Sequence, residues 1–183
     1  MAKYTQKAIM SAFREMLEEM PFDRITVSAL VKRCEISSNT FYYHYHDIYE
    51  LLNAWLHMEF GLYLSGEPDL VSVTKNLLRD CKANSRIIYH IFDSLSRNQL
   101  EHYVFTMTDD IFSRVVCGYA RGRSVPDSAL TEITRFCRYA FTGFFLHFLW
   151  GKMGADIDEA VDSLAALFDR FLKSAVEVYP IID

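Results

Sequence analysis

Residues 25–51 read ITVSALVKRCEISSNTFYYHYHDIYEL and decide the fold of the N-terminal part of the chain. Thr26 is a good N-cap for a short helix over residues 27–34, and Ser37 is a second N-cap for a helix over residues 38–45. A tight turn around Cys34 and Ile36 separates the two helices. The stretch therefore predicts two short helices packed across a turn, which is a helix-turn-helix.

The second of these helices has one apolar side and one uncharged polar side. Phe41 and Tyr45 are four residues apart, so they share a face and can pack against Leu30 and Val31 of the first helix. The opposite side has no Lys, Arg, Asp or Glu and consists of Ser38, Asn39, Tyr42, Tyr43 and His46. This composition suits hydrogen bonds to phosphates and base edges. We therefore expect this helix to enter the major groove of DNA.

The flanking sequence completes an N-terminal module. Apolar residues recur at helical spacing through residues 4–20, and Pro21 ends that helix. Asp47 caps a further helix over residues 48–62, after which Gly61, Gly66 and Pro68 interrupt the pattern. The sequence predicts a DNA-binding domain over residues 1–62.

The rest of the chain, residues 63–183, is predicted to be a helical bundle. Helical periodicity covers residues 69–83, 85–95, 97–121, 127–150 and 156–178, with breaks at Ser124–Asp127 and Gly151–Asp156. No strand pattern of any length appears. The fold class is therefore all-α with about nine helices, and we assign ligand binding and dimerisation to this second domain.

Composition excludes several classes of protein. No fingerprint of a nucleotide-binding loop or a catalytic nucleophile occurs, and the six histidines show no ligand spacing, so we predict no enzyme, metal or cofactor. The four cysteines are read as reduced thiols of a cytoplasmic protein. The longest apolar stretch is too short to span a membrane. The net charge of −5 counts mildly against nucleic-acid binding.

Residues 5–51 resemble the DNA-binding region of the TetR/AcrR family of transcriptional regulators. The matching residues are Thr26, Leu30-Val31, Ile36-Ser37, Thr40-Phe41-Tyr42, His44-Tyr45 and Leu51. The resemblance implies that phosphates are contacted by Thr26, Ser37, Thr40, Tyr42 and His44. It implies that base edges are reached by Ser38, Asn39 and Tyr43.

Three positions depart from the family pattern. Glu35 stands where the family usually has Gly in the turn, and a left-handed Glu costs about 1 kcal/mol relative to Gly. Asn39 replaces a second common Gly, and Ile48 replaces a phosphate-binding Lys. The lost cation predicts weaker nonspecific DNA affinity and a shallower dependence on salt.

The C-terminal half is similar, more loosely, to a subgroup that includes activators of dihydroxyacetone kinase operons. The similarity lies in Arg138–Leu167, where a mid-helix Gly precedes a Trp near the helix end, a Gly-rich turn and an acidic helix start.

The last two helices are expected to form a dimer interface. The helix over 127–150 is apolar nearly all round, so it must be buried on two sides. We infer a four-helix interface between two chains, formed by Phe141, Phe145, Phe148, Leu164, Phe168 and Phe171. The alternative is that both helices simply fill the core of a monomer.

The body is rich in aromatic residues and methionine, which in this family line a ligand cavity. The predicted pocket residues are Arg86, Tyr89, His90, Phe92, Tyr103, Met107, Phe112, Phe136, Tyr139 and Phe144. For any one of them, the alternative is plain core packing.

These observations lead to one main functional hypothesis and two alternatives. The main hypothesis is a homodimeric repressor that binds a near-palindromic operator in double-stranded DNA and is released by a small-molecule effector. The first alternative is an activator of the same fold controlled by a protein coactivator. The second is a helical-bundle interaction protein, or an enzyme, without DNA binding.

Overall fold

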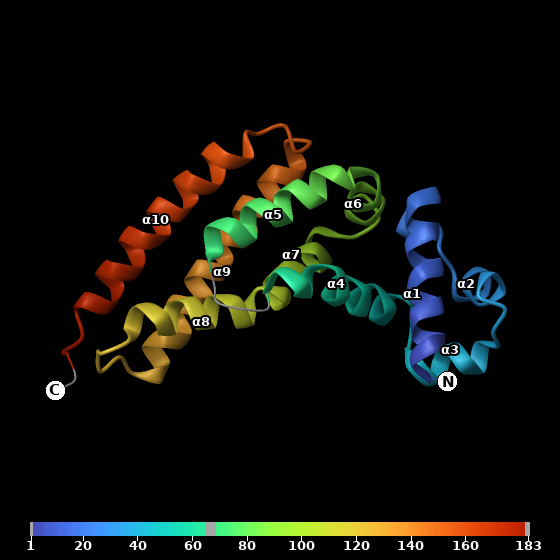
Figure 1. The fold of residues 1–183 in the computed structure, drawn as a ribbon, viewed down its shortest axis with the longest axis horizontal. Coiled ribbons are helices and arrows are strands. Elements are labelled where there is room, and N and C mark those ends of the chain that lie inside the picture. The colour runs from blue at the N-terminus through green and yellow to red at the C-terminus, as the bar shows by residue number, and fades with distance from the viewer. Residues whose placement is uncertain (1, 65–68, 182–183) are drawn as a thin grey trace. The chain divides into compact units, whose positions relative to one another are not determined.

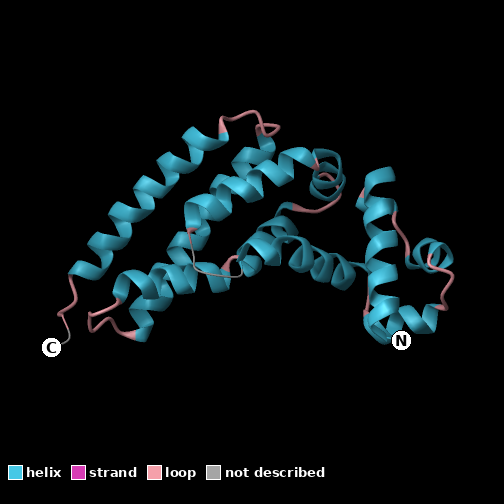
Figure 2. Ribbon diagram, in the orientation of Figure 1, coloured by secondary structure: helices cyan, strands magenta, loops and turns pink. Residues whose placement is uncertain are grey.

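The computed structural model describes residues 2–64 and 69–181. Within these ranges the secondary structure is helical, with ten α-helices and one short 3-10 helix (Figures 1 and 2). The predicted all-α fold class is confirmed. No helix in the described part of the chain combines the length and apolar character that crossing a membrane requires.

The helices form two compact units. The first contains Met1–Gly61 and Ala83–Leu100, and the second contains Leu62–Lys82 and Glu101–Asp183. The first unit thus gains a segment from beyond residue 62, because the helix at Ser85–Phe92 packs against the N-terminal helix. The functional division at residues 62 and 63 remains a prediction.

The first unit is built around the N-terminal helix α1 (Ala2–Glu19). A 3-10 turn η1 (Phe22–Arg24) leads to α2 (Val27–Arg33), α3 (Ser38–His44) and α4 (Ile48–Leu64), and α6 (Ser85–Phe92) covers α1. Phe13, Phe22 and Leu30 are fully buried in its core. The Nδ1 atom of His90 lies 2.6 Å from the carbonyl oxygen of Leu17 and ties α6 to α1.

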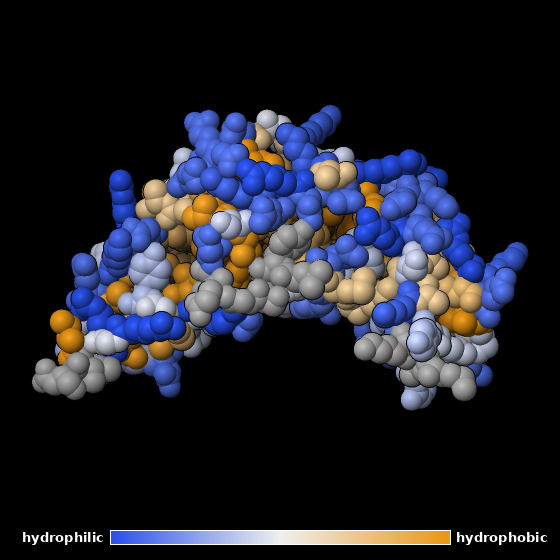
Figure 3. All heavy atoms as spheres, in the orientation of Figure 1, coloured by the Kyte–Doolittle hydropathy of each residue, from blue (hydrophilic) through white to orange (hydrophobic). Residues whose placement is uncertain are grey.

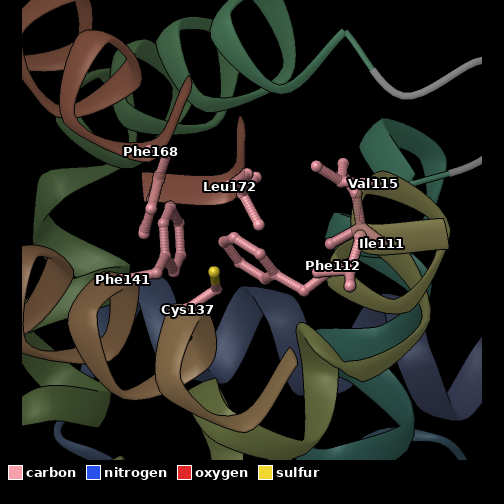
Figure 4. Close-up of a cluster of buried hydrophobic side chains, with 8 residues drawn as sticks. Ile111, Phe112, Val115, Cys137, Phe141, Phe168 and Leu172 are labelled. Carbon is pink, nitrogen blue, oxygen red and sulfur yellow. The ribbon is translucent and has the colours of Figure 1, made fainter. Parts of the chain in front are cut away.

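The second unit consists of α5 (Leu70–Ala83), the part of α7 (Arg97–Met107) from Glu101 onward, α8 (Asp109–Ala120), α9 (Asp127–Trp150) and α10 (Ile157–Glu177). Phe112 of α8 points into the centre of its core, where its ring lies 5.4 Å from Phe141 and 5.6 Å from Phe168 (Figure 4). Ion pairs join α5 to the start of α10 at the surface. Lys75 Nζ lies 2.7 Å from Asp162 and 3.1 Å from Asp158.

The single helix predicted over residues 97–121 is wrong, because α7 and α8 are separate helices that break at Thr108. The hydroxyl of Thr108 donates to the carbonyl oxygens of Val104 and Phe105, at 2.9 and 3.1 Å. Thr106 makes the same kind of bond to His102 and Tyr103. Such bonds bend helices, and apolar periodicity does not report them.

Two helices end in the same motif with a charged residue where glycine is preferred. At the end of α2, the N–H of Glu35 donates to Lys32 and that of Ile36 donates to Val31, while Glu35 has φ 53°. At the end of α9, Lys152 and Met153 donate to Leu149 and Phe148, and Lys152 also has φ 53°. Both are Schellman motifs. Glu35 is thus left-handed, and the expected cost relative to Gly applies to it.

Hydrophilic side chains cover most of the face drawn in Figure 3, and apolar side chains reach the surface in patches between them. The exposed large apolar residues of the described chain include Phe136 on α9 and Leu167 on α10.

Replacing Glu35 by Gly should raise the free energy of unfolding by about 1 kcal/mol, measured by urea denaturation. Glycine relieves the left-handed strain, and the change removes an acid from the negative end of the α2 dipole. Lys152→Gly should gain less, because its cation favours the negative end of α9. Glu35→Ala isolates the charge effect. Equal gains from Glu35→Gly and Lys152→Gly would contradict this account.

Candidate nucleic-acid interface

Side-chain caps begin both helices of the helix-turn-helix. The hydroxyl of Thr26 accepts a hydrogen bond from the N–H of Ala29 at 3.2 Å and starts α2. The hydroxyl of Ser37 accepts from the N–H of Thr40 at 3.1 Å and starts α3. The Ser37 and Thr40 hydroxyl oxygens also share a hydrogen bond of 2.8 Å. Both predicted N-caps are confirmed.

The inner side of α3 is locked into the first unit. Phe41 has no exposed surface, and Tyr45 follows it in the core together with Leu30 and Val31 of α2. The rings of Phe41 and Tyr45 lie 5.8 Å apart. Burial raises the pKa of the Tyr45 phenol above its usual value. The predicted inward face is therefore the buried one.

The outer side of α3 is open to solvent. Tyr43 is 81% exposed and Tyr42 57%, and Ser38 and Asn39 are exposed as well. Thr40 and His44 are half-buried, and the Tyr43 and His44 rings lie 5.0 Å apart at a steep angle. The structure thus brings hydroxyl, amide and aromatic groups together on one uncharged, exposed surface. Their contacts with DNA remain predictions.

A second capping network fixes the passage from α3 to α4. The Asp47 carboxylate accepts hydrogen bonds of 2.8 Å from the N–H groups of Tyr49 and Glu50. The bond from the Glu50 N–H is the main reason why the pKa of Asp47 is lowered. The Glu50 carboxylate in turn accepts from the N–H of His46 at 2.5 Å. These bonds hold α3 at a defined angle to α4.

The cation nearest to this surface in sequence, Arg33 at the end of α2, is paired within the protein. Its guanidinium donates to both carboxylate oxygens of Glu19 on α1, at 2.7 and 3.1 Å. The hydrogen bond lowers the pKa of Glu19 and raises that of Arg33. The pair is separated by 14 positions, so no local sequence signal predicts it. Lys32 and Arg24 are exposed beside it.

The ten predicted pocket residues are divided between the two units. Arg86, Tyr89, His90 and Phe92 belong to the first unit, and the other six belong to the second. Phe112 is packed in the second unit's core, and His90 is bound to the Leu17 carbonyl. Tyr103, Met107 and Phe144 are half-buried, whereas Phe136 and Tyr139 are exposed. A shared cavity around them remains a prediction.

Of the six predicted dimer residues, three lie in the chain's own core and three are half-buried. Phe141, Phe148 and Phe168 are buried inside the second unit, while Phe145, Leu164 and Phe171 are half-buried. The most exposed apolar residues of α9 and α10 are others: Phe136 at 55%, Tyr139 at 63% and Leu167 at 65%. The Phe136 and Phe171 rings lie 4.6 Å apart and join the two helices. Sequence periodicity alone did not separate these two faces of α9.

Within residues 2–64 and 69–181, no three His, Cys, Asp or Glu side chains lie close enough together to hold an ion.

Comparison with known proteins adds to this geometry. Residues 9–55 match the family model for bacterial regulatory proteins of the tetR family, and residues 69–170 match a model for a transcriptional regulator C-terminal region. The two matches cover the helix-turn-helix and most of the second unit. No curated protein matches the chain at a significant level.

The fold is shared with a solved structure. The dihydroxyacetone kinase operon activator DhaS is similar with a TM-score of 0.65 and 18% identity, over 96% of this chain and 97% of that one. NalD, the secondary repressor of the MexAB-OprM multidrug efflux pump in Pseudomonas aeruginosa, gives TM-scores of 0.47 and 0.49 with 18% and 17% identity in two structures. These cover 93% and 92% of this chain, and 97% and 95% of the NalD chains.

The helix-turn-helix seen in the structure and the two family matches, over residues 9–55 and 69–170, agree with one another. This family is one of regulators and not of enzymes. The chain belongs to the TetR family of bacterial regulatory proteins and is a DNA-binding transcriptional regulator.

Proposed function

We propose that the chain is a homodimeric repressor that reads a near-palindromic operator through α3 and is released by a small-molecule effector. The observation that carries the DNA part is the outer side of α3, which is exposed, uncharged and held in place by the buried Phe41. A surface of this kind offers hydrogen-bond donors and acceptors without carboxylates that would repel the phosphates.

The residues of this surface are proposed to make two kinds of contact, with base edges and with phosphates. Tyr43 is 81% exposed and Asn39 is exposed as well, and both are proposed to contact base edges with Ser38. The hydroxyls of Thr26, Ser37, Thr40 and Tyr42, together with the His44 imidazole, are proposed to contact phosphates. Phosphate contacts set the position of the helix, and base contacts select the sequence.

Dimerisation is proposed through the exposed faces of α9 and α10. Phe136, Tyr139 and Leu167 leave a large apolar area in water, which association with a second chain would bury. A two-fold dimer of this kind presents two recognition helices, and operators read in this way repeat at about 34–36 Å. The two-fold symmetry of the protein then matches the near-palindrome.

The effector is proposed to bind within the second unit. Support comes from the half-buried Tyr103, Met107 and Phe144, which are aromatic or polarisable side chains that are not fully packed. An effector that prefers one arrangement of the dimer would shift the population away from the DNA-competent form.

Replacing Tyr43 by Ala should weaken binding to the preferred operator by about 5- to 150-fold, because each good base contact contributes about 1–3 kcal/mol. Binding to a scrambled duplex should change little. Fluorescence anisotropy with both duplexes measures the difference. Val178→Ala, which alters a similarly exposed residue far along the chain, is the control. An equal loss on both duplexes would remove Tyr43 from base reading.

Restoring the family's cation with Ile48→Lys should strengthen DNA binding at low salt. One added phosphate contact should steepen the slope of log Kobs against log salt by about 0.9. The slope is measured by titration at several salt concentrations, with Ile48→Gln as the uncharged control. A slope equal to that of the control would show that residue 48 does not approach a phosphate.

Placing a charge at Phe136 should separate the dimer. Phe136→Glu puts a carboxylate into the proposed apolar interface, where its desolvation is unfavourable. Analytical ultracentrifugation should then report a monomer, while Tyr4→Glu, which changes a more exposed tyrosine on α1, should leave the dimer intact. If the Phe136→Glu variant sediments like the wild type, the interface lies elsewhere.

A further inference from the structure

The break between α7 and α8 is not imposed by strong helix-breaking residues. Residues 97–120 contain no proline, and their glycine lies at position 118, well past the break. The hydroxyl bonds of Thr106 and Thr108 bend a helix but leave its backbone bonds able to continue. The apolar pattern likewise favours one continuous helix. Contacts from outside the segment can therefore add to the local signals at Thr108, Asp109 and Asp110 that begin α8.

Arg138, in the middle of α9, contacts both sides of the break. Its Nε donates to the carbonyl oxygen of Phe105 at 3.1 Å, and its Nη2 donates to the same oxygen. Its Nη1 lies 2.5 Å from the carboxylate of Asp109, the first residue of α8. The guanidinium carbon lies 3.7 Å from the centre of the Phe105 ring. The Arg138 side chain is only 12% exposed.

These contacts compete directly with a continuous helix. In such a helix the Phe105 carbonyl would accept the N–H of residue 109, whereas here it accepts Arg138 and Thr108. A cation at the carboxyl end of α7 is also favoured by that helix's dipole. Charge-assisted bonds of this kind are stronger than neutral ones. Arg138 thus stabilises the broken form specifically.

Helix α7 is less buried than α8, although Val104 packs against the core of the second unit. None of its side chains is fully buried, whereas α8 buries Ile111, Phe112, Val115, Val116 and Ala120. The helix also crosses the boundary between the units, because Leu100 ends the part assigned to the first and Glu101 begins the part assigned to the second. Because a helix is stiff, a change of direction at residue 108 also shifts the first residues of α7.

We propose that Arg138 is a clamp that holds residues 97–120 in the broken form, and that its release joins α7 and α8 into one helix. The segment is then a two-state element through which the second unit acts on the DNA-binding unit. This regulatory role rests on the proposed function, but the clamp itself does not.

Electron spin resonance can measure the state of the segment. Spin labels are placed on Cys117 and on a cysteine introduced by His102→Cys, both exposed and both in the second unit. Cys34 is replaced by Ala. Cys81 and Cys137 are buried, and burial raises their pKa to about 12 and about 11, so they resist labelling. Dilution with unlabelled chain removes distances between subunits.

The wild type should show a shorter distance than a straight helix allows. Arg138→Gln should move the distribution toward a Cα separation of about 22 Å, the length of a continuous helix between these positions. Arg135→Gln is the matched control, because Arg135 lies one turn earlier on α9 and pairs with Glu132. An unchanged distance in a folded Arg138→Gln protein overturns the clamp.

A second variant keeps the test decisive if Arg138→Gln does not fold. Asp109→Asn removes only the exposed carboxylate of the clamp and should produce a smaller shift in the same direction. No shift in this variant would also overturn the proposal.

Operator affinity tests the regulatory role separately. Arg138→Gln should change Kd by about fivefold or more, the usual size of a coupling between sites, and Arg135→Gln should not. A changed distance with unchanged affinity overturns the coupling. A wild type that binds DNA without sequence preference defeats the proposed function, and the spin-label distances still decide the clamp.

Discussion

Burial of Phe41 is the constraint on which the exposed outer side of α3 depends. Its ring has no exposed area and packs beside Tyr45, so the inner side of α3 cannot rotate outward. Burying an aromatic ring of this size contributes about 1.5–3 kcal/mol. Because a helix presents its faces at fixed angles, this burial also fixes the direction of Tyr43 and Asn39. The caps at Ser37 and Asp47 then fix where the helix begins and how the chain leaves it.

Electrostatics sets this regulator apart from a strongly basic DNA-binding protein. The chain carries a net charge of −5, and Arg33 beside the reading helix is bound to Glu19. Under the proposed contacts, neutral donors on α3 carry a larger share of the DNA contact than in a basic domain. Salt weakens binding in proportion to the number of neutralised phosphates, so we expect a shallow dependence on salt and a greater reliance on fit to the operator sequence.

The second unit contains both a dense core and the segment, residues 97–120, that we propose to be movable. Phe112, Phe141 and Phe168 pack densely at the centre and hold α8, α9 and α10 together. Helix α7 lies at the margin of this packing, with no fully buried side chain and a polar clamp at its end. The well-buried helix α8 thus directly follows the less buried helix α7 in sequence. Switching elements are drawn from the less stable parts of a structure.

The sequence by itself determined the all-α class, the bounds of α9, both N-caps of the helix-turn-helix and the uncharged side of α3. Periodicity and capping are local, so they can be read along the chain. Only the tertiary structure decided which aromatic residues of α9 fill the core and which, like Phe136 and Tyr139, remain exposed. It also placed α6 against α1, paired Arg33 with Glu19 and brought Arg138 to the break at Thr108. Those contacts join residues far apart in sequence, and helical periodicity shows which residues share a face but not what that face meets.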